Sequence, residues 1–187
     1  ANQKIVDTDY PYFITHDWAM PYRADRIKAL LTDASNHTIE GYKRIQTDIQ
    51  SIMAKRFLPL MLAVTPDLKT KETHSLLSRW DGSMEKRSIE PLLFHTWYRE
   101  LTRFLYADEL GDKFDAVWSR KPNFMYRTLV SENQWCDDVK TDPIESCSQQ
   151  IDAAQNAALL WLRERYGSDL KSWQWGIAHN ARHTHQA

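Results

Sequence analysis

The chain has 187 residues, with 24 basic and 25 acidic side chains and a formal net charge of -1. This balance provides neither the basic excess typical of nucleic-acid binding nor the acidic tail of a solvating, disordered protein. Hydrophobic residues make up 42% and aromatic residues 12%, enough for one compact domain that buries roughly 70% of its unfolded surface. The longest uncharged apolar run, 57–64, is far shorter than the roughly 20 residues that span a bilayer. We therefore expect neither nucleic acid nor a membrane as a partner.

Neither end of the chain has the features of a natural boundary. The sequence opens with Ala1 and Asn2, without a start methionine or a charged-then-apolar leader, and it stops just after His185. We interpret the chain as a segment of a longer protein.

The hydrophobic pattern predicts helices along most of the chain. Five glycines are few for a fold rich in β-turns. Only the stretches 4–6 and 12–15 are expected to be extended. Apolar residues recur every three or four positions in the other segments. Helices are predicted over 23–32, from Thr38 through Met53 toward Pro59, over 70–80, 91–111, 123–130 and 142–166. The prediction is a mainly α fold, with an extended N-terminal segment over 1–22 and a helical domain over 23–187.

Local signals mark several helix ends. Thr38 is a suitable N-cap for the helix that begins after it. Pro59 is expected to kink or end that same helix. Gly111 is placed to terminate the helix that starts near Pro91. The run from Asp142 to Glu145 combines a capping Asp, a proline at the first helical position and a Glu three residues after the cap, which predicts a helix start.

Cys136 and Cys147 enclose ten residues. A loop of this size can close into a disulfide, and this is the favoured interpretation if the protein is exported, whereas in a cytosolic protein two buried free thiols are the better interpretation. The spacing alone leaves both alternatives open.

No complete active site is visible in the sequence. His179, His183 and His185 have a spacing that suggests a zinc site, but no carboxylate or cysteine lies beside them, and a structural or surface role is the alternative. Asp137 and Asp138 have no identifiable partner and are interpreted as loop residues. The chain contains no Gly-x-Ser-x-Gly nucleophile motif and no phosphate-binding glycine loop.

The stretch 10–27 packs aromatic, proline, aspartate and arginine residues ahead of a helix. Charged side chains in such surroundings are costly to bury unless they are paired or functional, and a structural Arg–Asp pair that fastens this loop to the helix is one interpretation.

This stretch, together with several motifs, resembles the β-subunit of the penicillin acylase family of N-terminal-nucleophile amidohydrolases. The resemblance covers nearly the whole chain, and the order and spacing of its motifs make it specific. Its motifs are Ala1-Asn2, Asp17-Trp18 followed by Pro21-Tyr22-Arg23-Ala24-Asp25-Arg26-Ile27, Ile45-Gln46-x-Asp48, Arg79-Trp80-Asp81-Gly82 and Trp173-x-Trp175-Gly176-x-x-His179.

The resemblance implies that the chain is a helical segment of an acylase β-chain, packed beside a four-layered αββα core. The nucleophile would be an N-terminal Ser outside this sequence, created by autocatalytic cleavage and activated by its own α-amino group. Asn2 matches the asparagine that donates to the oxyanion, and Arg26 matches the arginine that supports this asparagine. Arg23 is assigned a substrate-side or structural role at most. Gln3 departs from relatives that have a second Asn there.

The resemblance also implies the surroundings of the chain. The partners would be the remainder of the β-chain, the α-chain of the same precursor and a small N-acyl substrate such as a β-lactam or an acyl-homoserine lactone. A periplasmic location would favour the Cys136–Cys147 disulfide. No cofactor is required, but some relatives hold a structural calcium, and Asp17 lies near the position of one ligand.

Two rival hypotheses make different predictions. A non-catalytic helical interaction module predicts that Asn2 and Arg26 are dispensable for turnover. A metalloenzyme built on His179, His183 and His185 predicts stoichiometric zinc.

Overall fold

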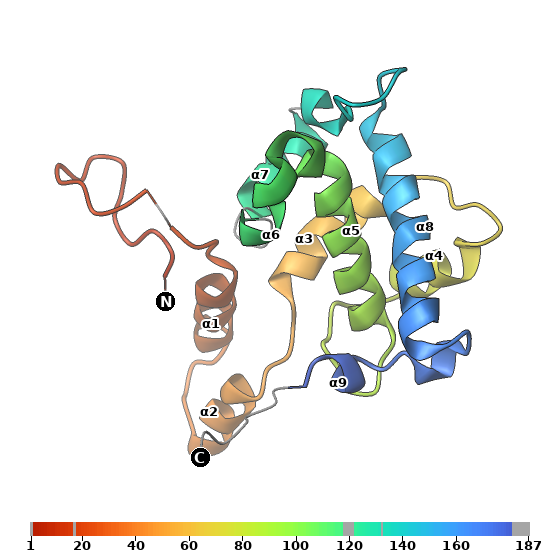
Figure 1. Cartoon of the computed structure of the whole chain (residues 1–187). Helices are drawn as coiled ribbons and strands as arrows, with labels where there is room; N and C mark the ends of the chain where they lie inside the picture. The colour runs from red at the N-terminus through yellow and green to blue at the C-terminus, as the bar shows by residue number, and fades with distance from the viewer. Residues whose placement is uncertain (1, 17, 118–121, 132, 181–187) are drawn as a thin grey trace, which may run out of the picture.

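The structure, a computed structural model, describes residues 2–16, 18–117, 122–131 and 133–180, and within these ranges the fold is helical and has no strand (Figure 1). The mainly α prediction is confirmed. None of the described helices has the length and apolar character needed to cross a membrane. The helices are α1 Tyr22–Thr32, α2 Ile39–Gln46, α3 Ile52–Met61, α4 Lys71–Ser78, α5 Glu90–Leu110, α6 Phe114–Val117, α7 Pro122–Val130, α8 Cys147–Tyr166 and α9 Trp175–Ala178.

Helices α5 and α8 pack side by side and form the centre of the core (Figure 1). The apolar stripe predicted for α5 faces inward, and the helix ends as expected at Gly111. Trp97 is almost fully buried, and its indole N–H donates to the Ile151 carbonyl of α8 at 3.0 Å, so this large core side chain also satisfies its polar atom. Helix α3 contributes Phe57, whose ring meets that of Tyr98 edge to face.

The start of α8 differs from the prediction. Asp142 was expected to cap the helix, but Ser146 is the N-cap and forms a capping box with Gln149. Glu145, expected in the first turn, instead accepts a hydrogen bond from the Asp138 backbone N–H and holds the preceding loop. The prediction was wrong because an equally good capping pair lies four residues further along, and the loop uses the acidic side chain.

The helix expected from Thr38 to Pro59 is two helices. Thr38 caps α2 as predicted, since its hydroxyl accepts from the Gly41 N–H at 3.0 Å. Helix α2 then stops at Gln46, and α3 starts after a second cap, Ser51. Pro59 lies inside α3, two residues before its end, so it does not terminate the helix.

The break between α2 and α3 is caused by backbone pairing with a distant turn. The N–H of Ser51 donates to the Gly82 carbonyl at 2.9 Å, and the N–H of Met84 donates to the Ile49 carbonyl at 2.9 Å. Gly82 adopts a φ of +86°, which a glycine reaches at little cost. Extended backbone is needed for this pairing, so the helical pattern cannot continue through 47–51.

The described residues of the N-terminal segment, 2–16 and 18–21, contain no helix, and the stretches expected to be extended form no strand. It lies beside α1, away from the α5–α8 pair (Figure 1). The Ala19 N–H donates to the Asn2 carbonyl at 3.0 Å, which brings the two ends of the segment together. Asn2 is thereby held close to the start of α1.

A disulfide joins Cys136 to Cys147, with the two Cα atoms 4.9 Å apart. It ties the short turn Asn133–Cys136 to the first residue of α8. Asp108 of α5 accepts from the Val139 N–H at 2.8 Å, so the loop closed by the disulfide is also attached to the core. The pairing implied by the family resemblance is confirmed.

Replacing both cysteines by serine should lower the free energy of unfolding by about 2–4 kcal/mol, because the unfolded chain loses a cross-link across this loop. The midpoint of thermal unfolding measures the effect, and reducing agent should destabilise the native chain but leave the double variant unchanged. Equal midpoints for the oxidised native chain and the double variant would contradict this prediction.

Candidate functional site

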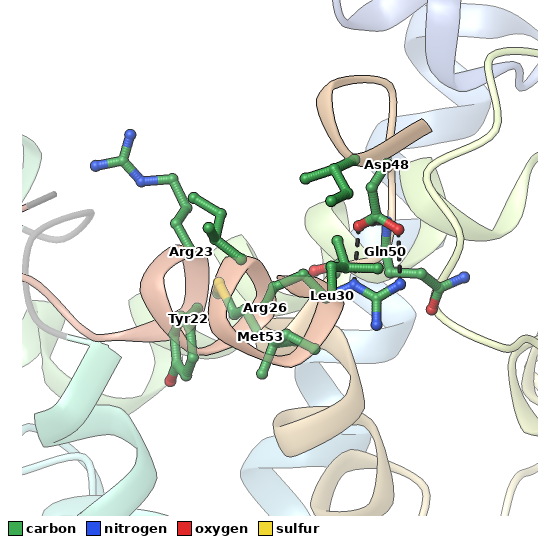
Figure 2. A pocket seen from close by; sticks show the side chains of 11 residues that line it. Tyr22, Arg23, Arg26, Leu30, Asp48, Gln50 and Met53 are labelled. Atoms are coloured by element: carbon green, nitrogen blue, oxygen red, sulfur yellow. Dashed lines mark hydrogen bonds and ion pairs between the residues drawn. The ribbon is translucent and has the colours of Figure 1, made fainter. Parts of the chain in front are cut away.

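A cavity of about 280 Å³ opens between α1 and the segment that connects α2 to α3 (Figure 2). Arginine and aspartate side chains form one part of its wall, and the rest is mostly apolar. The apolar lining residues are Tyr22, Ile27, Leu30, Ile45, Ile52 and Met53.

Arg26 and Asp48 form a bidentate ion pair in this wall. The Arg26 Nε donates to Asp48 Oδ1 at 2.9 Å, and Nη2 donates to Oδ2 at 2.6 Å (Figure 2). The side chains are 28% and 17% exposed. Two parallel, charge-assisted hydrogen bonds fix both distance and orientation, so the pair fastens α1 to the segment before α3. This matters because α1 contains no buried residue.

The pair keeps both groups ionised. The hydrogen bond from Arg26 holds the pKa of the Asp48 carboxyl below its usual value, against the opposing effect of partial burial, and the Gln50 backbone N–H adds to the lowering. The hydrogen bond to Asp48 likewise raises the pKa of Arg26. The site therefore holds a salt bridge at neutral pH rather than a neutral pair.

Asp48 is linked to the turn at 80–83 through Gln50, whose backbone N–H donates to Asp48 Oδ1 at 3.3 Å. The Gln50 side-chain amide donates to Asp81 at 3.4 Å, and Asp81 accepts from the Ser83 N–H at 2.8 Å. The Trp80 indole N–H donates to the Ser83 carbonyl at 2.9 Å and closes the turn. Two motifs that are separated by more than thirty residues thus lie together. The sequence alone does not predict this contact, because the two motifs lie far apart along the chain.

Asn2 contacts Arg23, not Arg26. The Arg23 Nη2 donates to Asn2 Oδ1 at 2.9 Å. Figure 2 shows the Arg23 guanidinium directed away from the Arg26–Asp48 pair. The resemblance assigned the support of Asn2 to Arg26, but among the described residues the Arg26 guanidinium is bound to Asp48 and no hydrogen bond joins it to Asn2. Direct support comes from the arginine one helical turn earlier.

The sequence profile of the penicillin amidase family matches residues 1–187. The chain belongs to this family. It is 25% identical, over 203 aligned positions, to the acyl-homoserine lactone acylase QuiP of Pseudomonas aeruginosa, covering 96% of this chain and 24% of the relative. QuiP of Pseudomonas syringae pv. syringae gives the same figures. The penicillin acylase 2 proenzyme of Pseudomonas sp. strain SE83 is 28% identical over 109 positions, covering 57% of this chain and 14% of the proenzyme.

The chain spans about a quarter of the length of the acyl-homoserine lactone acylases that it matches. It is therefore a part of a penicillin amidase sequence when measured against these relatives. The resemblance seen in the motifs is confirmed over the full chain.

The terminal motif of this penicillin amidase chain has a structural explanation. The N–H groups of Trp175 and Gly176 donate to the carbonyls of Ser88 and Lys86 at 3.0 and 2.8 Å. A Cβ atom on Gly176 would lie 3.0 Å from the Lys86 carbonyl oxygen and closer still to its side chain, so a glycine permits this approach. The motif attaches α9 to the loop that precedes α5.

His179 is part of an aromatic stack. Its ring lies 4.6 Å from that of Trp175, at an interplanar angle of 11°, and His95 stacks on Trp175 at 5.0 Å. Burial, with a smaller effect of His179, lowers the pKa of His95 to about 4. The stack lines a second cavity of about 590 Å³, beside Trp161 and Arg99. The sequence alone does not predict this cavity, because its lining residues come from several elements.

Several predicted ligands lie outside the described residues. Asp17, the calcium ligand implied by the resemblance, is one, and His183 and His185 of the zinc hypothesis are the others. Among the residues that the structure describes, no group of three or more His, Cys, Asp or Glu side chains could hold a metal ion. These residues alone do not form a calcium or zinc site.

Asp48→Asn should destabilise this penicillin amidase chain at neutral pH by about 1–3 kcal/mol, because an amide cannot replace the ionised acceptor of Arg26. Asp48 has a lowered pKa in the folded state, so its contribution is complete above the unfolded-state pKa and is lost as the pH falls through the folded-state pKa. The two proteins should therefore converge in stability in acid.

Urea unfolding at a series of pH values measures this difference. Asp112→Asn, a change at an exposed carboxylate in the turn after α5, serves as the control and should leave the stability nearly unchanged. A stability difference between Asp48→Asn and the native chain that stays constant with pH would argue against the ion pair.

Proposed function

We propose that this chain is part of an N-acyl amide hydrolase. Membership of the penicillin amidase family over residues 1–187 carries this proposal. Its relatives are named as an acyl-homoserine lactone acylase and a penicillin acylase proenzyme. The substrate would be an amide that links an acyl chain to a homoserine lactone, a β-lactam nucleus or a related amine.

The reaction would begin with a serine hydroxyl from another part of the protein. This hydroxyl attacks the amide carbonyl carbon while its proton passes to the α-amino group of the same serine. The carbonyl oxygen becomes an oxyanion, the C–N bond then breaks, and the amine leaves with the proton. Water releases the acyl group from the serine in a second, equivalent step. This chemistry needs no cofactor, and any calcium would be structural.

Asn2 would contribute an N–H donor to the oxyanion. A donor that is fixed before the reaction stabilises the charge that develops in the transition state and adds little to substrate binding. Asn2 is exposed and held at its carbonyl by Ala19 and at its side chain by Arg23. The contacts of Asn2 suit such a role, since they occupy its carbonyl and its Oδ1 and leave its side-chain Nδ2 as the group that could donate to the oxyanion.

Arg26 would act on the site through Asp48. The ion pair fixes α1, and α1 carries Arg23 one turn before Arg26. In this proposal Arg26 supports Asn2 indirectly, by holding the helix from which Arg23 extends.

The protein would be periplasmic and would work together with the remainder of its β-chain and with an α-chain from the same precursor. The Cys136–Cys147 disulfide supports this compartment, because disulfides persist in oxidising environments. A relative named as a proenzyme supports processing from a precursor.

Asn2→Ala in the full-length protein should lower kcat by about 10²–10³-fold and change KM little, because the lost donor acts mainly in the transition state. Steady-state assays with penicillin G and with acyl-homoserine lactones of several chain lengths measure both constants and also the acyl preference. Asn36→Ala, at an exposed asparagine between α1 and α2, is the matched control. Unchanged turnover in Asn2→Ala would contradict the proposal and favour the non-catalytic helical interaction module.

A further inference from the structure

We infer that Arg23 is a positioning residue that decides which end of the Asn2 amide faces the substrate. The inference rests on the proposed function, and it assigns to Arg23 a role that the family resemblance gave to Arg26. The observation behind it is the 2.9 Å hydrogen bond from Arg23 Nη2 to Asn2 Oδ1.

An asparagine side chain has two ends of nearly equal shape and opposite chemistry. Its Oδ1 only accepts hydrogen bonds and its Nδ2 only donates them. An oxyanion is stabilised by Nδ2 and repelled by Oδ1, so a rotation of the amide by half a turn would convert a stabilising group into a destabilising one. A donor for the oxyanion therefore has to be held in one orientation.

Arginine is well suited to fix this orientation. The guanidinium carries only donors and is always charged, so it can bind Oδ1 and cannot bind Nδ2. With Oδ1 on Arg23, the Asn2 Nδ2 faces the other way. Among the described residues no acceptor binds this Nδ2, so it is available to a group from outside them.

Two further contacts make the orientation rigid. The Asn2 carbonyl accepts at 3.0 Å from the N–H of Ala19, which lies three residues before α1 begins, and this contact holds the backbone of Asn2. Three residues after Arg23, Arg26 binds Asp48 in two places. Residues three apart lie on neighbouring turns of one helix face, so the Arg26–Asp48 pair limits rotation of α1 and with it the direction of Arg23.

The two arginines therefore have different tasks. Figure 2 shows their guanidinium groups diverging from α1, with Arg26 directed to Asp48 and Arg23 directed away from the Arg26–Asp48 pair. Arg23 acts on Asn2 directly, whereas Arg26 acts on the position of the helix.

The test is a double-mutant cycle in the full-length protein with Asn2→Ala, Arg23→Met and the combination of both. Methionine keeps an unbranched side chain and removes the donors. Arg23→Met should lower kcat by about 10–100-fold, less than Asn2→Ala, and leave KM nearly unchanged, because the amide loses its fixed orientation. In the Asn2→Ala background the same change should have no further effect on kcat, because the group that it orients is gone.

Arg23→Lys provides the conservative variant. Lysine retains a charged donor, so it should restore part of the kcat that Arg23→Met loses, and a role in packing alone would not give this rescue. Arg44→Met, at an exposed arginine on α2, is the matched control and should leave kcat unchanged. Thermal unfolding of each variant shows whether it is folded.

The outcomes separate this inference from the proposed function. If Asn2→Ala lowers kcat and Arg23→Met does not, the inference is overturned and the proposed function stands. Losses that multiply in the double variant would also overturn the inference, since Arg23 would then act independently of Asn2. If Asn2→Ala itself leaves kcat intact, the proposed function fails and the inference fails with it.

Discussion

The bidentate pair of Arg26 and Asp48 connects helix α1 to the rest of the described chain. Exposed ion pairs contribute little to stability, but this one has two parallel hydrogen bonds and side chains that are less than a third exposed. Helix α1 has no buried residue, so apolar packing alone does not determine its position. The placement of Arg23, and through it the orientation of Asn2, depends on this contact.

The pair in turn depends on the helical core. Asp48 lies two residues after the end of α2, next to the extended backbone at 49–51 that pairs with the turn around Gly82. That turn leads through α5 into the α5–α8 core, where Trp97 is buried and hydrogen-bonded. A chain of contacts thus connects the buried core to an exposed asparagine. Rigid support of this kind is what a donor to a developing charge requires.

The sequence predicted what depends on local signals. The stripe of α5, its end at Gly111 and the cap at Thr38 follow from the spacing of apolar residues and from side-chain capping, and all three are present. The start of α8 and the break after Gln46 were missed because each is decided by competing partners elsewhere in the chain. The family resemblance assigned the support of Asn2 to Arg26, whereas the structure places the Asn2 side chain against Arg23 and Arg26 against the distant Asp48, a difference that local sequence signals do not reveal. The roles of Asn2 and Arg26 in catalysis stay predictions.

The role proposed for Asn2 depends on the direction of its side-chain amide. A crystal structure of the full-length protein with a boronic-acid mimic of the tetrahedral intermediate would show it directly. We expect Asn2 Nδ2 about 2.7–3.1 Å from the oxyanion oxygen of the mimic, with Oδ1 still bound to Arg23. A side chain of Asn2 that is directed away from the mimic, or that binds it while Arg23 points elsewhere, would contradict the account.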